Sequence, residues 1–348
     1  NTIPQTITLD HWNDKMNLAA EKTFCNYSFY FGATNDNLHE IEKIDPRKTG
    51  ALKIFMGSST GNMLVDDKKT LEQIFDRCPT LIAVHAEVEE IIDENFKKAK
   101  QKWGDDMPAE AHAFIRNEEG CVESSKLAIE LAKKREARLH ILHLTTAEEV
   151  SLFQKGFDES KRITTEVCPH HLWYSTDDYA EYGNRIKCNP AIKGSHNKKG
   201  LLEGLKEGYI DMVVSDHAPH LPSEKDQPYL KAAAGIPTVQ HTFNMMQEIA
   251  GKNDIQLTEL VKWMSHRQAD LYKIRERGYL REGYYADLAV YNPDSEWQVN
   301  KENIKYKCQW SPLEGHTFKG RFEKTFVNGE LVYDLKNSSN NKQGAGMA

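Results

Sequence analysis

The stretch Val213-Val-Ser-Asp-His-Ala-Pro-His220 is the part of the sequence that says most about the fold. Its two valines are typical of the end of a buried strand, and Asp216, His217 and His220 then place a carboxylate and two imidazoles on the loop that follows. Pro219 stiffens this loop by fixing its backbone φ angle. In a barrel of parallel strands, loops at the carboxyl ends of the strands carry metal ligands and general bases. A capped surface turn has the same local pattern, so the rest of the chain must decide.

Composition excludes several classes of protein. The chain has 348 residues and a hydrophobic content of 39%, which is enough to build a core. Its formal net charge of −7 argues against nucleic acid as the main partner. No run of 18 apolar residues is present, so we expect no membrane span. The six cysteines form no Cys-x-x-Cys pair, which excludes a zinc ribbon and argues against a disulfide scaffold. We therefore expect a reduced, cytoplasmic protein.

Strand-like apolar segments alternate with helix-like segments over the first 220 residues. The clearest amphipathic helix is expected at 121–137, where apolar residues recur among charges. Such alternation predicts a parallel sheet with helices outside it, and at this length it favours a (β/α)₈ barrel over an open sheet. No Gly-rich nucleotide-binding motif is present. The six expected strands are 24–31, 51–56, 81–85, 139–144, 162–167 and 210–214.

The pattern changes after residue 220. Helices are expected at about 238–250 and 256–275, and short strand-like segments follow at 283–291 and 324–333. The second of these contains Asn328-Gly329, a strong signal for a β-hairpin. These short strands predict a small β-module after the barrel.

The chain is therefore expected to have three parts. The last of them is polar and rich in glycine, which is typical of a disordered segment. The parts are a barrel at 1–277, a β-module at 278–334 and a disordered tail at 335–348.

Four residues of the expected strands have side chains suited to a metal site. Lys53 lies inside an otherwise apolar strand, His85 and His143 end two others, and Asp216 follows the last. Each has an ordinary explanation, because a buried histidine is usually a core residue and a strand lysine usually points to solvent. A barrel, however, brings the ends of all its strands to one mouth. We therefore expect these four side chains to meet.

Lysine is a poor metal ligand at neutral pH, but the carbamate that it forms with CO₂ is an anionic oxygen donor able to bridge two metals. Zinc accepts such mixed nitrogen and oxygen ligands. Two metals about 3.5–4 Å apart activate a water and polarise a carbonyl. The set therefore favours hydrolysis of an amide or imide.

Five motifs together resemble those of the cyclic amidohydrolases, and among these the dihydroorotases most closely. The resemblance runs over essentially the whole chain. Each motif alone is weak, but their order is specific. The motifs are Leu52-Lys-Ile-Phe-Met56, Val84-His-Ala-Glu87, Leu142-His-Leu-Thr-Thr146, Glu166-Val-Cys-Pro-His-His-Leu172 and Ser215-Asp-His-Ala-Pro-His220.

The resemblance implies a site with two Zn²⁺ ions and a specific reaction. Lys53 would be the carboxylated bridging lysine, His85 and His143 would bind one metal, and Asp216 would bind the other. Asp216 would also be the catalytic proton shuttle, taking a proton from the attacking hydroxide and delivering it to the leaving nitrogen. The reaction would be the reversible hydrolysis of L-dihydroorotate to N-carbamoyl-L-aspartate in pyrimidine synthesis.

The resemblance also implies a substrate-binding set. Asn1 and His220 would hold the substrate carboxylate, and His220 would separate this chain from the hydantoinases. Asn189 would contact the pyrimidine ring, and the backbone around Gly235 would line the pocket. Supporting roles are expected for His170, His171 and His217, whereas His112 and Arg116 suit either a cover over the mouth or a solvated helix.

One family feature is absent from the sequence. The first strand of these enzymes ends in a His-x-His pair that binds a metal, and no such pair precedes Lys53. The strand count explains this absence if 24–31 is the third barrel strand, so that strands 1 and 2 precede Asn1. A barrel with six strands alone would leave two open edges.

Two alternatives stay open. One is a hydantoinase, dihydropyrimidinase or allantoinase, and the other is a metal-free partner subunit without catalysis. The resemblance also implies a small-molecule substrate and a homodimer or larger assembly. Association with other enzymes of pyrimidine synthesis is a further expectation.

Overall fold

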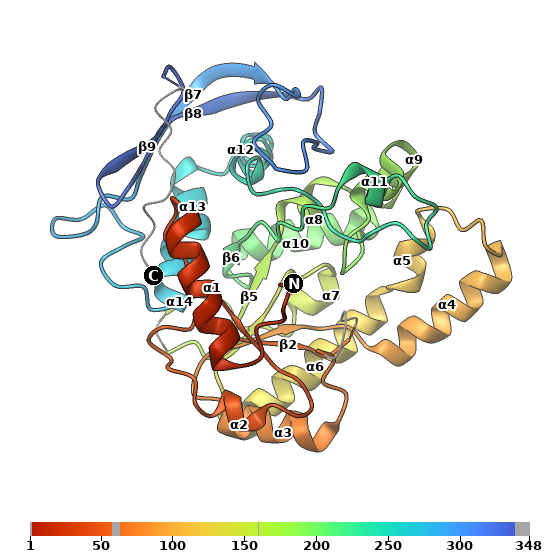
Figure 1. The fold of residues 1–348 in the computed structure, drawn as a ribbon. Helices are drawn as coiled ribbons and strands as arrows, with labels where there is room; N and C mark the ends of the chain where they lie inside the picture. Colours follow the sequence, from red (N-terminus) through yellow and green to blue (C-terminus); the bar gives the residue numbers. More distant parts are fainter. Residues whose placement is uncertain (1, 58–62, 159, 338–348) are drawn as a thin grey trace.

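The computed structural model describes residues 2–57, 63–158 and 160–337, and a six-stranded parallel sheet lies at its centre (Figure 1). Each strand pairs in parallel with the next strand in sequence, as repeated strand–helix units require. This consecutive order confirms the predicted β/α architecture. The strands are β1 (Phe31–Gly32), β2 (Leu52–Phe55), β3 (Ile82–His85), β4 (Leu139–Ile141), β5 (Ile163–Val167) and β6 (Met212–Val213).

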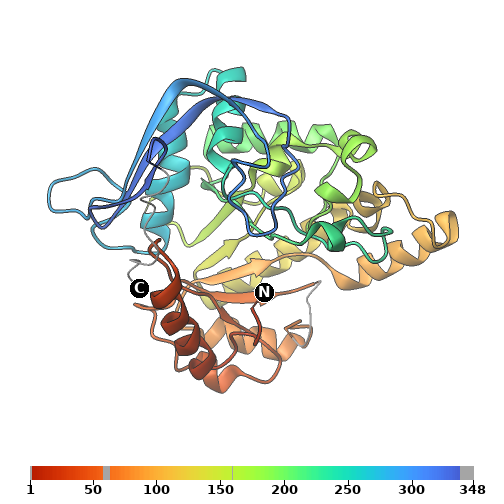
Figure 2. The ribbon, with the colours of Figure 1, turned by 45° about the horizontal axis from the view of Figure 1, so that its top comes forward.

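Helices connect these strands. In both ribbon views α4 extends away from the rest of the fold (Figures 1 and 2). Among the described residues, two α-helices come before β2, four lie between β2 and β4, and four more lie between β4 and β6. They are α1 (Leu9–Lys22), α2 (Leu38–Ile41), α3 (Lys68–Arg77), α4 (Glu89–Trp103), α5 (Ala111–Ile115), α6 (Glu118–Arg135), α7 (Ala147–Val150), α8 (Pro169–Trp173), α9 (Tyr179–Tyr182) and α10 (Ser195–Glu207).

Local sequence explains why α6 begins and ends where it does. The Asn117 side chain accepts a hydrogen bond from the backbone N–H of Gly120, which satisfies one free donor of the first turn. Acidic residues follow in that turn and basic residues fill the last one, as the helix dipole favours. The helix ends at Glu136, whose φ of 52° lies in the left-handed region. The helix expected at 121–137 is thus confirmed, with a start three residues earlier.

The first strand is much shorter than predicted. Only Phe31 of the segment 24–31 lies in β1, because only Phe31 and Gly32 have strand partners, namely Leu52 and Lys53. An aromatic pattern indicates which segment is buried or extended, but the number of paired residues depends on the neighbouring strand.

The predicted C-terminal hairpin is confirmed. β8 (Thr317–Val327) pairs with both β7 (Leu288–Gln298) and β9 (Glu330–Asp334) in an antiparallel sheet, drawn in blue in Figure 1. The turn between β8 and β9 consists of Asn328 and Gly329, with φ angles of 56° and 83°. Positive φ at both central residues is what a two-residue hairpin turn requires.

Between β6 and this sheet lie further helices, and the segment expected at 256–275 is divided. A π-helical stretch at Lys262–His266 separates its two α-helical parts. The helices are α11 (Pro222–Lys225), α12 (Thr242–Lys252), α13 (Leu257–Val261) and α14 (Arg267–Leu271).

A hydrophobic cluster joins the antiparallel sheet to the preceding part of the chain. It contains Ile236 and Met245 together with Val299, Trp310 and Phe318. Apolar packing therefore crosses residue 277, and a domain boundary there stays a prediction. Most of the expected tail, 338–348, lies outside the described residues. Within the described ranges, no helix is both long and apolar enough to cross a membrane.

Candidate active site

Two buried imidazoles face each other beyond the carboxyl ends of β3 and β4. His85 is the last residue of β3 and His143 lies two residues beyond β4, and His85 Nδ1 is 3.1 Å from His143 Nε2. His85 Nε2 lies 2.7 Å from a Glu87 carboxylate oxygen, so this nitrogen carries the proton and Nδ1 presents its lone pair. Two nitrogens bound to one tetrahedral Zn²⁺ lie about 3.3 Å apart. The separation thus suits two ligands of one cation.

The protonation states of these histidines agree with a ligand role. Burial lowers the pKa of His85, and it lowers the pKa of His143 well below its usual range. Both rings are therefore neutral at neutral pH, as metal binding requires. His143 Nδ1 is also buried and has no hydrogen-bond partner among the described residues. A buried polar atom of this kind is costly unless a group outside the chain satisfies it.

Lys53 and Asp216 form the second half of the site. Burial lowers the pKa of the Lys53 amine to about 7, against the opposing effect of the carboxylates of Asp216 and Glu166. Burial raises the pKa of Asp216 to about 6, and here Lys53 opposes the shift. The two groups thus lie close enough to interact. A partly neutral amine at pH 7 is the form that reacts with CO₂, which fits a carbamate.

Glu166 on β5 is a further acidic group whose place the sequence did not reveal. Its carboxylate lies 2.9 Å from His140 Nε2 and accepts a hydrogen bond of 3.4 Å from the backbone N–H of His143. It therefore holds the backbone that presents His143. The motif that contains Glu166 is visible in the sequence, but its contacts across two strands have no sequence signature.

A second group of potential metal donors follows β5 directly. One ligand atom each from Cys168, His170 and His171 lies within 4.8 Å of the others, and all three residues are buried. Both ring nitrogens of His170 and Nδ1 of His171 have no hydrogen-bond partner among the described residues. His171 also contributes to the lowered pKa of His143, so this group adjoins the first. These residues could therefore hold a cation beside the main site.

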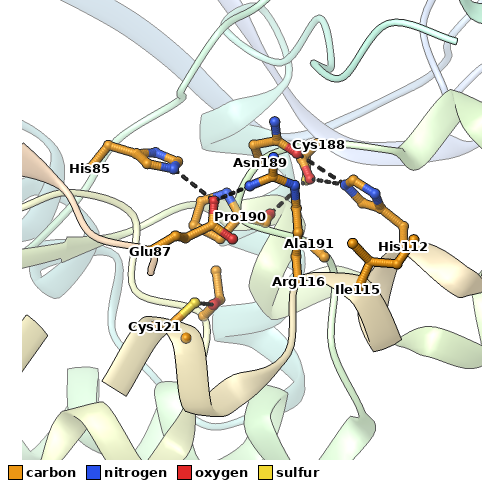
Figure 3. A network of polar contacts seen from close by, with 12 residues as sticks. His85, Glu87, His112, Ile115, Arg116, Cys121, Cys188, Asn189, Pro190 and Ala191 are labelled. Carbon is orange, nitrogen blue, oxygen red and sulfur yellow. Dashed lines mark hydrogen bonds and ion pairs between the residues drawn. The ribbon is translucent and has the colours of Figure 1, made fainter. Parts of the chain in front are cut away.

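Asn189 is held by a histidine of α5. His112 Nε2 lies 3.0 Å from Asn189 Oδ1 and 2.9 Å from the Cys188 carbonyl oxygen (Figure 3). His112 Nδ1 lies 2.9 Å from the Tyr229 hydroxyl. The proton of His112 is therefore on Nε2, and Asn189 Oδ1 is an acceptor. This directs the Asn189 amide N–H groups away from His112. His112 is buried, so it does not belong to a solvated helix face.

Arg116 forms a buried ion pair with Glu87, the same carboxylate that accepts from His85 (Figure 3). The Arg116 side chain is only 11% exposed. Burial alone would raise the pKa of Glu87, but Arg116 and His85 outweigh it and lower that pKa to about 2. Glu87 is therefore a permanent anion that fixes the tautomer of His85.

Gly235 lies against His220. The φ of Gly235 is 151°, and a Cβ atom there would lie 2.8 Å from His220 Cδ2 and 2.7 Å from Ala218 Cβ. Only glycine therefore fits. The His220 imidazole has no hydrogen-bond partner among the described residues, and Glu224 lies 3.8 Å from it.

Two buried lysines fix this loop, and neither has a sequence pattern that marks it. Lys225 Nζ donates hydrogen bonds of 2.8–2.9 Å to the carbonyl oxygens of Lys187, Ala233 and Gly235. Lys187 Nζ donates in turn to two carbonyls of the same loop, those of Tyr229 and Ala232. Because these acceptors are backbone atoms, no side-chain pattern could have indicated them.

The structure thus brings Lys53, His85, His143 and Asp216 into one electrostatically coupled group. Cys188, the residue before Asn189, interacts with this group: burial and, after it, the charge of Asp216 raise the pKa of its thiol. Their individual roles stay predictions. Asn1 lies outside the described residues.

Comparison with known proteins agrees with this geometry. The profile of the amidohydrolase family matches residues 13–332. A dihydroorotase of Methanosarcina acetivorans is 31% identical over 99% of this chain and 75% of that protein. An allantoinase of Salmonella paratyphi B is 28% identical over 97% of this chain and 76% of its own length. Among solved structures, the L-hydantoinase of Arthrobacter aurescens superposes with a TM-score of 0.92 at 27% identity, covering 99% of this chain and 78% of that one.

Proposed function

Because this chain belongs to the amidohydrolase family, we propose that it is a dihydroorotase that opens the ring of L-dihydroorotate to give N-carbamoyl-L-aspartate. The main support for a metal-dependent hydrolase is that ring nitrogens of His85 and His143 face each other at 3.1 Å. Lys53 as its carbamate, His85, His143 and Asp216 would hold the metals. Bound divalent cations such as Zn²⁺ would polarise the scissile carbonyl and acidify the attacking water.

Asp216 moves the proton in this reaction. Its carboxylate accepts a proton from the attacking water as the oxygen–carbon bond forms. The tetrahedral carbon then collapses, the carbon–nitrogen bond breaks, and the leaving nitrogen takes the proton from Asp216. A carboxyl group whose pKa burial raises toward neutrality, to about 6, suits both steps. The reverse sequence closes the ring.

The His220 imidazole forms no hydrogen bond to another described side chain and would be able to donate to an anionic substrate. Dihydroorotate carries a carboxylate, whereas hydantoin, dihydrouracil and allantoin carry none on the ring. His220 lies against Gly235 in a loop that two buried lysines fix, so its ring is presented at a defined place. The Asn189 amide N–H groups, directed away from His112, would donate to a ring carbonyl.

A substrate panel tests the proposal. The metal-loaded protein and a His220→Asn variant are assayed on L-dihydroorotate, dihydrouracil, hydantoin and allantoin. We expect the highest kcat/KM for dihydroorotate, and about a tenfold or greater loss in the variant for this substrate only. A kcat/KM for any of the other three that equals or exceeds the value for dihydroorotate would overturn the assignment.

The second candidate is a hydantoinase or allantoinase activity. It is favoured by the similarity to the L-hydantoinase of Arthrobacter aurescens and to the allantoinase of Salmonella paratyphi B. Under this alternative, His220→Asn would leave kcat/KM for the preferred substrate unchanged. A metal-free partner subunit is less well supported, because the candidate ligand positions within the described ranges are occupied by residues that bind metals.

The setting of the enzyme is part of the same proposal. The absence of paired cysteine motifs fits a reducing compartment, and all six cysteines are free thiols. We place the protein in the cytoplasm, as a homodimer or larger assembly, in association with other enzymes of pyrimidine synthesis.

A further inference from the structure

A cavity lies at the opposite end of the parallel sheet from the candidate active site. Its volume is about 380 Å³, and residues that come just before strands line it: Gly50 before β2, Thr80 before β3, Arg138 before β4 and Arg162 before β5. His85 and His143 instead lie at or beyond the carboxyl ends of β3 and β4, and Asp216 lies beyond the carboxyl end of β6. Residues Leu271–Lys273, at the end of α14, complete the wall. The cavity is therefore separate from the site described above.

Four cationic side chains line this cavity, and three of them have no acidic partner in the part of the chain that the structure describes. Arg135 is neutralised by Glu72 at 3.0 Å and Asp76 at 3.6 Å. Arg138 donates to the Leu271 carbonyl oxygen at 2.7 Å, and neither it nor Arg162 nor Lys273 forms an ion pair within the described ranges. Among described residues, the one unpaired acid in the lining is Glu136. The wall thus has an excess of positive charge in a chain whose formal net charge is −7.

Strand register forces two of these cations together. Leu139 of β4 is paired with Ile163 of β5, so the residues before them, Arg138 and Arg162, are also neighbours. The backbone N–H of Leu139 donates to the Arg162 carbonyl oxygen at 2.8 Å. Adjacent parallel strands are about 4.8 Å apart and present paired residues to the same side. Burial lowers the pKa of Arg138, and repulsion from Arg162 lowers it further.

We propose that this cavity binds a small phosphorylated molecule, held by the guanidinium groups of Arg138 and Arg162. A guanidinium donates two parallel hydrogen bonds to phosphate oxygens, and two of them together match a dianion. Lys273 adds a third positive charge, while Phe75, Pro79 and Tyr272 line the cavity and provide apolar surface for the rest of the molecule. The volume lies within the range of small-molecule sites.

Calorimetric titration in low-salt buffer tests this site. The probes are inorganic phosphate, pyrophosphate and adenosine 5′-monophosphate, with adenosine as the uncharged counterpart. We expect saturable binding of at least one phosphate probe and none of adenosine. Tight binding of the nucleotide alone indicates a phosphate ester, and binding of phosphate and pyrophosphate indicates the free anion.

Three variants assign the binding to the cavity. Arg162→Gln removes an exposed side chain and should leave folding intact while weakening binding about tenfold or more. Arg138→Lys keeps the charge but removes the two parallel hydrogen bonds of the guanidinium, and should give a smaller loss of binding affinity. Arg321→Gln makes the same change on β8, and its affinity for the phosphate probes should lie within about twofold of that of the unaltered chain. The absence of saturable binding to every phosphate probe, or binding that Arg162→Gln leaves unchanged, overturns the proposal.

Discussion

The guanidinium of Arg116 forms a buried ion pair with the carboxylate of Glu87, although 28 residues and the whole of α4 lie between them. Glu87 in turn accepts from His85 Nε2, so α5 and its flanks reach the candidate metal site through this carboxylate. Partners of this kind orient a metal-binding imidazole and raise its basicity. The pair therefore gives a first prediction.

Glu87→Gln should weaken metal binding about 10- to 100-fold, because His85 loses the anion that fixes its tautomer. Competition with a chelator measures the affinity. Glu42→Gln is the matched control, since Glu42 also pairs with an arginine, Arg77, but on the exposed surface. If the Glu87 variant and the unaltered chain bound the metal with equal affinity, Glu87 would have no role in supporting the metal site.

Lys53→Ala should lose metal and activity, and a short carboxylic acid should restore both in part by taking the place of the carbamate. Metal content by mass spectrometry and turnover, each with and without added acetate or propionate, give the readout. Full metal occupancy in Lys53→Ala without the added acid would contradict a bridging role.

Lys225→Met should lower the free energy of unfolding by about 3 kcal/mol, because three backbone carbonyls lose their donor. It should also raise KM, since the same bonds fix the loop that carries His220 and Gly235. Urea unfolding and steady-state kinetics measure the two effects. Lys231→Met, an exposed lysine of the same loop, is the control. Unchanged stability and KM in Lys225→Met would rule out this role.

His241 should make the protein less stable in acid. Its ring is buried and packs against Trp297 and Phe318, and burial lowers its pKa to about 4. Between about pH 6.5 and pH 4 the unfolded chain binds a proton that the folded one does not, so stability falls as pH falls. The fall attributable to this group approaches about 1.4 kcal/mol per pH unit within that window. Above about pH 6.5 this group makes no contribution to the pH dependence of stability.

Urea unfolding of the unaltered chain and of His241→Gln from pH 4 to pH 7 measures this difference. The variant should show the shallower dependence of unfolding free energy on pH. His39→Gln, at an exposed position, should follow the unaltered chain. Parallel curves for His241→Gln and the unaltered chain would show that His241 is not held neutral.

Residue spacing is enough to predict the elements that carry the site. Apolar runs mark the parallel strands, and the polar residues at their carboxyl ends indicate Lys53, His85, His143 and Asp216 as one group. Asn328-Gly329 predicts its hairpin because two residues with positive φ leave little choice of turn. These features depend on local chemistry, which sequence records directly.

Contacts between distant segments could not be predicted in the same way. The charged pattern around Arg116 suits a solvated helix equally well, and only the return of α5 to β3 reveals its pairing with Glu87. Lys187 and Lys225 bind backbone carbonyls, which any residue type supplies. The segment 24–31 has the aromatic character of a strand, yet Phe31 pairs with Leu52, the first residue of β2, so the residues before Phe31 have no partner in that strand.

The central claim is that this chain hydrolyses L-dihydroorotate with Asp216 as the proton carrier. Its most direct test is the turnover of L-dihydroorotate by the metal-loaded protein and by its Asp216→Asn variant, with folding checked by circular dichroism. We predict turnover by the unaltered protein and a loss of about 10³-fold or more in the variant. Turnover by Asp216→Asn within tenfold of the unaltered protein would contradict the account.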